Sequence, residues 1–157
     1  MSNKGLLVIA LAMLSVGIVG LWLLGWGIIA PGNSNSTPAE RGALIFNTGA
    51  DDSGRRIAYS GGMMMSASCA SCHGANGRGL RTPMFVSPDI TYRNLTDPAG
   101  MVEPEGGRGM RYTDDLIRRA VTQGIDAEGK QLAWPMPRWQ LTDAQWDDLL
   151  AYLKTLP

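Results

Sequence analysis

The chain has 157 residues, enough for one domain and a short additional segment. Its 14 lysines and arginines balance its 14 aspartates and glutamates, so the formal net charge is zero. This balance excludes the basic surface that a nucleic-acid-binding domain requires, and we expect no nucleic-acid partner.

Residues 5–30 form a continuous apolar segment, and no charged residue lies between Lys4 and Glu40. As a helix this segment would extend roughly 39 Å, enough to cross the ~30 Å hydrocarbon core of a membrane with some tilt. The alternative, a cleaved signal peptide, has an apolar core of only about 7–15 residues and a small-residue cleavage site. The stretch 28-IIAPGN-33 offers no such site. We therefore expect an uncleaved transmembrane anchor over residues 5–30.

The flanks of the anchor predict its orientation and the domain boundaries. Residues 1–4 include a lysine, whereas the segment behind the anchor carries no charge, so the positive-inside rule places the N-terminus in the cytoplasm. Residues 31–38 are rich in Pro, Gly, Asn and Ser and are typical of a flexible tether. We expect a single-pass protein of the cytoplasmic (inner) membrane, with residues 39–157 as a periplasmic domain.

Three helices in this domain have clear sequence signals, namely a polar N-cap or a glycine stop together with apolar residues on one face. They are expected at residues 38–49 with the stop Gly49, at 114–125 with the N-cap Thr113 and the stop Gly124, and at 146–156 behind the capping box of Thr142 and Gln145. No sustained period-2 alternation predicts a sheet. The expected fold is a small all-α domain. With only two Phe in the chain, its core should need a bound group to fill it.

Both cysteines and the only histidine of the chain lie together in 69-CASCHG-74. A structural zinc site normally has four protein ligands, and the chain has no second Cys or His pair. A redox-active dithiol belongs to a βαβ context, which the predicted elements lack. C-x-x-C-H is also the attachment signature of c-type haem, in which two cysteines bond the vinyl groups and the histidine ligates the iron. We predict one covalent haem c on Cys69, Cys72 and His73, with zinc and a dithiol as the alternatives.

The second axial ligand of the iron must come from another part of the chain, and no second histidine exists. Methionine is the natural candidate, and the chain has nine. Met136 lies in 134-WPMPRW-139, where a proline on each side favours a stiff, extended loop between two predicted helices. We predict Met136 as this ligand, with Met110 or an open iron as the alternatives. Ordinary core packing is the other role that a methionine in this place would have.

Taken together, these features resemble a class I c-type cytochrome in a membrane-anchored form with one haem. The matching segments are 41-RGALIF-46, 69-CASCHG-74, 77-GRGLRTP-83, 136-MP-137 and 151-AYLKTL-156. The resemblance implies three to five helices around the haem, with the first and last helices crossing at small and aromatic residues. The residues suggested for this crossing are Gly42 and Phe46 against Trp146, Leu149 and Tyr152.

The resemblance also implies a proline carbonyl that accepts a hydrogen bond from the proximal histidine, and Pro83 matches that position in the sequence. Two regions are longer than the family requires. We therefore interpret residues 48–66 and 84–112 as insertions, which usually form surface loops. The run Met63–Met65 in the first insertion would pack over the haem edge or form an exposed docking patch.

An iron with both axial positions filled has no vacancy for a substrate, so the resemblance implies electron transfer and not enzymatic catalysis. The expected role is to carry single electrons between membrane-bound respiratory complexes, from a quinol-oxidising complex to a terminal reductase or oxidase. The chain would act as a separate carrier or as a fixed subunit of one complex. The alternative is a haem subunit of a membrane oxidoreductase whose open or weakly ligated iron binds a small molecule.

Overall fold

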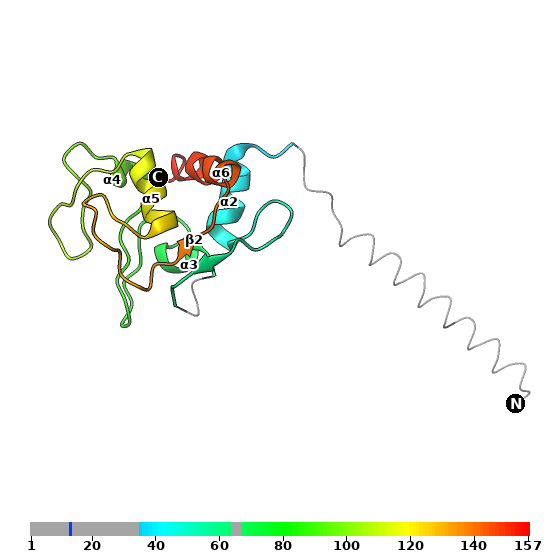
Figure 1. The fold of residues 1–157 in the computed structure, drawn as a ribbon, viewed down its shortest axis with the longest axis horizontal. Coiled ribbons are helices and arrows are strands. Elements are labelled where there is room, and N and C mark those ends of the chain that lie inside the picture. Colours follow the sequence, from blue (N-terminus) through cyan, green and yellow to red (C-terminus); the bar gives the residue numbers. More distant parts are fainter. Residues whose placement is uncertain (1–12, 14–34, 64–66) are drawn as a thin grey trace, which may run out of the picture. The chain divides into compact units, whose positions relative to one another are not determined.

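The computed structural model describes residue 13, residues 35–63 and residues 67–157. In chain order the elements are α2 (Pro38–Thr48), β1 (Tyr59–Ser60), α3 (Cys69–His73), α4 (Tyr92–Leu95), α5 (Asp114–Gln123), β2 (Arg138–Trp139) and α6 (Asp143–Leu153) (Figure 1). The predicted anchor over residues 5–30 lies, apart from Met13, outside the described residues. Within the part of the chain that is described, no helix has the length and apolar character needed to span a membrane.

Helices α2 and α6 pack side by side (Figure 1). Gly42 is at their crossing, where an added Cβ atom would lie 1.9 Å from the Asp148 carbonyl oxygen and 2.8 Å from the Tyr152 Cβ. One helical turn later, the fully buried Phe46 ring lies 5.2 Å from the Tyr152 ring, measured between centroids. The expected crossing of the first and last helices at small and aromatic residues is therefore present.

An ion pair fixes the same two helices relative to each other. The guanidinium of Arg41 donates from Nε and Nη2 to the two carboxylate oxygens of Asp148, at 2.8 and 2.6 Å. Such a two-bond geometry sets the rotation of both side chains as well as their distance. The Asp148 side chain is largely buried, so this directional contact lies within an interface between α2 and α6 that is otherwise apolar.

The sequence signals for helix ends agree with the structure. Thr113 and Thr142 are N-caps of α5 and α6, and Thr142 forms the predicted capping box with Gln145. Gly49 and Gly124 both have a φ of 69°, a left-handed conformation in which glycine avoids the strain of a side chain. The expected caps and glycine stops are confirmed, whereas the last helix, expected at 146–156, begins at Asp143 and ends at Leu153.

One cap was not foreseen. Thr37 forms a capping box with Glu40, and Pro38 is the first residue of α2. Proline suits the first helical position because its missing N–H would have no partner there. The helix start at residue 38 agrees with the prediction, but the cap was not predicted because 31-PGNSNSTP-38 has the composition of a tether.

The segments that follow α2 and α5 share both a sequence pattern and a conformation. The sequences 49-GADDSGRRI-57 and 124-GIDAEGKQL-132 both read Gly-x-Asp-x-x-Gly-basic-x-aliphatic. In each loop the last residue donates its N–H to the carbonyl of the first glycine, at 2.9 Å in the first loop and 2.8 Å in the second. The aspartate carboxylate accepts from the N–H of the basic residue, at 3.1 and 2.8 Å. Region 48–66 thus begins with a copy of the loop at 124–132.

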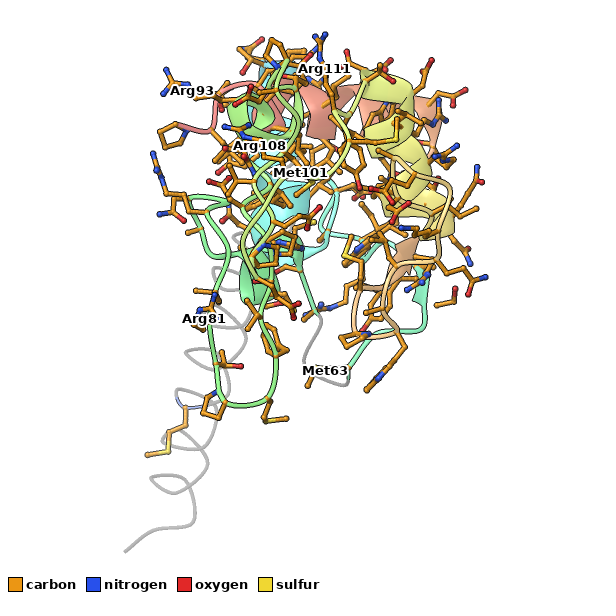
Figure 2. All side chains as sticks on the ribbon, turned by 90° about the vertical axis from the view of Figure 1, so that its left-hand side faces the viewer. Met63, Arg81, Arg93, Met101, Arg108 and Arg111 are labelled. Atoms are coloured by element: carbon orange, nitrogen blue, oxygen red, sulfur yellow. The ribbon has the colours of Figure 1, made fainter. Side chains whose placement is uncertain are left out.

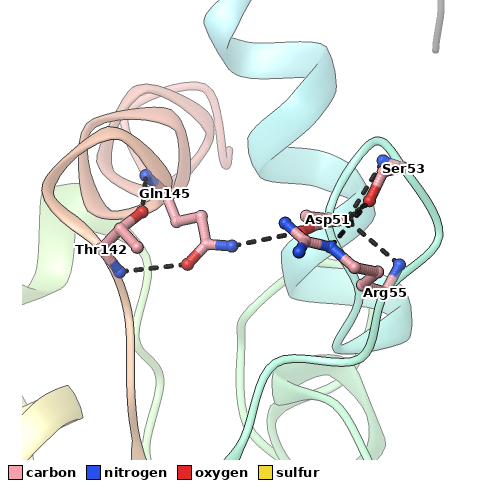
Figure 3. Close-up of polar contacts among 5 residues, drawn as sticks. All are labelled: Asp51, Ser53, Arg55, Thr142 and Gln145. Atoms are coloured by element: carbon pink, nitrogen blue, oxygen red, sulfur yellow. Dashed lines mark hydrogen bonds and ion pairs between the residues drawn. The ribbon is translucent and has the colours of Figure 1, made fainter.

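Asp51 fastens the first of these loops to α6 (Figure 3). Its Oδ1 accepts from the N–H and hydroxyl of Ser53, and its Oδ2 accepts from Nε2 of Gln145 at 3.4 Å. Burial alone would raise the pKa of Asp51, but the hydrogen bonds from Ser53 and Arg55 outweigh it and lower that pKa. The loop therefore holds an ionised carboxylate against the side chain that also caps α6.

Strands β1 and β2 each follow one of the two loops in the chain, and they pair with each other. They pair in antiparallel register, Tyr59 with Trp139 and Ser60 with Arg138, and the first pair brings two rings to a centroid distance of 4.9 Å. The all-α expectation omitted this small sheet, since strands of two residues carry no alternating pattern.

Candidate haem-binding site

Helix α3 presents the three residues of the C-x-x-C-H motif to the interior. The hydroxyl of Ser68 caps the helix by accepting from the N–H of Ser71 at 3.2 Å. Positions i, i+3 and i+4 of a helix share one face, so Cys69, Cys72 and His73 point in similar directions. All three line one cavity.

This cavity has a volume of about 320 Å³ and a mostly apolar lining. Its size falls within the range of about 300–1,000 Å³ that is usual for ligand pockets. Its walls include the core residues Phe46, Leu149 and Leu153 from α2 and α6. The buried side chains thus surround the cavity, as expected for a domain whose core a bound group completes. This lining fits an apolar macrocycle with a central metal. The two cysteine thiols would attach the macrocycle, and the imidazole of His73 would bind the metal.

His73 is held in the form that binds a metal. The residue is 6% exposed, and Nδ1–H donates to the Pro88 carbonyl at 3.1 Å. Because a carbonyl oxygen only accepts, this bond places the proton on Nδ1 and leaves a lone pair on Nε2. Burial lowers the pKa of His73, although the bond to Pro88 opposes the shift. The imidazole is therefore neutral and its ring orientation is fixed.

The prediction that Pro83 accepts this hydrogen bond is wrong. Residues 80–87 form a small hairpin, in which the N–H of Ser87 donates to the Leu80 carbonyl at 2.9 Å. This hairpin places Pro83 in its exposed turn and returns the chain to α3 at Pro88. Two prolines follow the motif within a short distance, and the sequence alone did not indicate which one lies beside His73.

The surroundings of the cysteines do not supply a zinc site, because among the described residues no group of three or more His, Cys, Asp or Glu side chains could hold a metal ion. Cys69 as a whole is half-buried, but desolvation of its thiol raises the pKa of Cys69 to about 12. A metal-binding or redox-active cysteine needs the thiolate, and such sites lower the pKa. Neither cysteine forms a disulfide. The protonated, cavity-facing thiol of Cys69 instead fits addition to a vinyl group.

Met136 lies on the loop between β2 and the second Gly-x-Asp-x-x-Gly segment and lines the same cavity as His73. Met110 does not line it and is 54% exposed. Met63 and Met101 do line the cavity, while Met64 and Met65 fall outside the described residues. The predicted ligand pair is therefore brought together, and the predicted alternative Met110 is not part of the cavity wall.

Region 84–112 is more than a surface insertion. Leu95, Met101 and Tyr112 from this region are buried and line the cavity, and the Tyr112 N–H donates to the Leu95 carbonyl at 2.8 Å. Figure 2 looks onto this region, where the outer side carries exposed arginines. They are Arg93, Arg108 and Arg111, and Arg81 of the preceding hairpin is exposed as well. Sequence reasoning missed the inner side, because single apolar residues between turns form no periodic pattern.

Comparison with known proteins agrees with this site. The cytochrome c family model matches residues 39–157, which include the whole cavity lining and the C-x-x-C-H motif. The chain matches no curated protein and no solved structure at a significant level. The family model covers most of the chain, and members of this family bind haem c covalently and transfer electrons. The chain therefore belongs to the cytochrome c family and is an electron-transfer protein with covalently attached haem c.

Proposed function

We propose that this protein is a membrane-anchored electron carrier in which His73 and Met136 are the axial ligands of one haem attached to Cys69 and Cys72. The observation that supports it best is that all four side chains line a single apolar cavity. Bound haem supplies a one-electron couple between ferric and ferrous iron.

The residues around the cavity are expected to adjust the reduction potential of this couple to a value suited to electron delivery. The bond from His73 to Pro88 holds the imidazole ring and increases its basicity as a ligand. A methionine thioether favours ferrous iron and raises the reduction potential, and an apolar lining that excludes water acts in the same direction. With both axial positions filled, the protein would exchange electrons with a partner without binding a substrate.

The membrane part of the proposal comes from the sequence. Residues 5–30 would cross the cytoplasmic membrane, with residues 1–4 in the cytoplasm and the haem domain on the periplasmic side. Attachment to the bilayer would raise the effective concentration of the carrier at membrane-bound partners. A quinol-oxidising complex is the proposed electron donor, and a terminal reductase or oxidase is the proposed acceptor.

Met136→Ala in the full-length haem protein tests the axial assignment. We expect the variant to lose the red charge-transfer band of thioether-ligated ferric haem. Its potential should fall by at least about 59 mV, the shift that corresponds to a tenfold change in a one-electron equilibrium. Optical redox titration measures both quantities.

Met110→Ala is the matched control, because Met110 is exposed and outside the cavity lining, and we expect it to behave like the wild type. If Met136→Ala keeps the band and the potential, the axial assignment is wrong. Met63→Ala and Met101→Ala would then show whether another methionine of the cavity wall serves as the ligand.

Alkaline carbonate washing of membranes tests the anchor. The wild-type haem should remain in the pellet, whereas a chain that lacks the apolar segment 5–30 but carries an export signal should release its haem into the wash. Release of the full-length protein by carbonate would contradict the anchor. Reduction of the washed membranes by quinol, followed by reoxidation by an added acceptor, would then test the proposed role as a carrier.

A further inference from the structure

Arg138 follows Met136 by two positions and bonds to the backbone of the loop that carries this methionine. Its Nη2 donates to the Leu132 carbonyl at 2.8 Å, and its Nη1 donates to the carbonyls of Ala133 and Met136. One planar guanidinium thus joins the beginning and the end of segment 132–136. Hydrogen bonds with a charged donor are stronger than bonds between neutral groups.

The position of this guanidinium is fixed from the opposite side by Gly124, the C-cap of α5. A Cβ atom added at Gly124 would lie 2.0 Å from Nε of Arg138, so the guanidinium occupies space that only glycine leaves open. The C-terminal end of a helix also carries partial negative charge, which favours a cation beside it. The backbone of Arg138 is held as well, since it pairs with Ser60 in the sheet.

The first copy of the loop shows that Arg138 is not needed for the Gly-x-Asp-x-x-Gly conformation itself. Segment 49–57 adopts the same backbone hydrogen bonds, although the atoms nearest to its first glycine, Gly49, belong to Ala67 and Trp139 and not to a guanidinium. What Arg138 adds in the second copy is the set of bonds to residues 132–136, including the carbonyl of Met136.

We propose that Arg138 is the positioning residue that keeps the Met136 thioether within reach of the haem iron. This inference rests on the proposed axial role of Met136. Without the guanidinium, the N–H of Met136 would still donate to the Ala133 carbonyl at 3.1 Å, and the segment would still be held at Leu132 and Trp134 by backbone bonds to Gly124 and Gly62, at 2.8 and 3.0 Å. The carbonyls of Leu132 and Met136, however, would lose the bonds that Arg138 donates. Loss of the guanidinium would let the loop open more often and release the iron–sulfur bond.

Titration of the ferric, full-length protein with imidazole measures this opening, because imidazole binds the iron only when the thioether has left. We expect Arg138→Ala to bind imidazole at least about tenfold more tightly than the wild type. Loss of one charge-assisted hydrogen bond of ordinary strength shifts an equilibrium by about that factor. Arg138→Lys should be intermediate, since an ammonium cannot reach three carbonyls at once.

Gly124→Ala provides an independent test that leaves Arg138 in the sequence but displaces its side chain. It should also bind imidazole more tightly than the wild type. Gly129→Ala is its control, because Gly129 has a similarly positive φ of 84° but no atom within 4 Å of an added Cβ. Arg118→Ala is the control for charge, because it removes a guanidinium that pairs with Asp143 on the surface.

Each outcome decides the proposal. Tighter imidazole binding in Arg138→Ala and Gly124→Ala, with both controls at the wild-type value, supports it. Wild-type affinity in Arg138→Ala, together with an altered spectrum in Met136→Ala, overturns the role of Arg138 and leaves the axial assignment intact. Unchanged spectra in Met136→Ala overturn both. If Arg138→Ala does not accumulate, Arg138→Lys and Gly124→Ala carry the test.

Discussion

Replacing Cys69 and Cys72 together with alanine is expected to give a chain that retains no haem after denaturation and extraction with acidified acetone. Wild-type protein should keep all of its haem, because thioether bonds to the vinyl groups survive acid whereas iron–ligand bonds do not. Each single replacement leaves one covalent bond, so Cys69→Ala and Cys72→Ala should both remain coloured after extraction. The absorbance of the protein precipitate measures the outcome.

Ser71→Ala is the matched control for these variants, because Ser71 is an exposed residue between the two cysteines on α3. It changes the same helix but leaves both sulfurs in place, so its haem should resist extraction. Haem that stays on the double variant would place the attachment elsewhere. Wild-type haem that leaves with the solvent would contradict covalent binding altogether.

Gly42→Ala is expected to lower the free energy of unfolding by about 3 kcal/mol or more. On helix propensity alone, alanine would be favoured over glycine by about 1 kcal/mol. At this crossing, however, the added methyl would lie 1.9 Å from the backbone carbonyl oxygen of Asp148, which cannot move without shifting α6. Unfolding of the ferric protein in guanidinium chloride, monitored by circular dichroism, measures the change.

Leu44→Ala on the exposed side of the same helix is the control, and its effect should be small because Leu44 is 43% exposed. The sign of the Gly42→Ala result is diagnostic. A stabilised variant would mean that helix propensity outweighs packing at this position. The tight crossing of α2 and α6 would then not be essential to the fold.

Helices whose ends are marked by local chemistry could be predicted from the sequence. A threonine N-cap needs only its own hydroxyl and the next turn of backbone, and a glycine stop needs only its own conformational freedom. Thr113, Thr142 and Gly124 were therefore predicted correctly. Helix α4 and the sheet of β1 and β2 could not be predicted, because elements of two to four residues depend on contacts with distant parts of the chain.

The candidate site divides in the same way. The C-x-x-C-H motif is a local pattern, and its three side chains follow from the geometry of one helix. Pro88 reaches His73 by way of the hairpin, and Met101 reaches the cavity wall by way of the long loop, so their places depended on the fold. Arg138 was missed because its partners are backbone carbonyls, which leave no mark in a sequence.

The cavity described above has a consequence for the assembly of the protein. Its walls come from α2, from α6 and from the long central loop, so many buried side chains of the domain would contact the prosthetic group as well as one another. Before the porphyrin is attached, these side chains would lack part of their packing, so the polypeptide is expected to be less stable than the haem protein. Ligation would thus complete the packing of the domain.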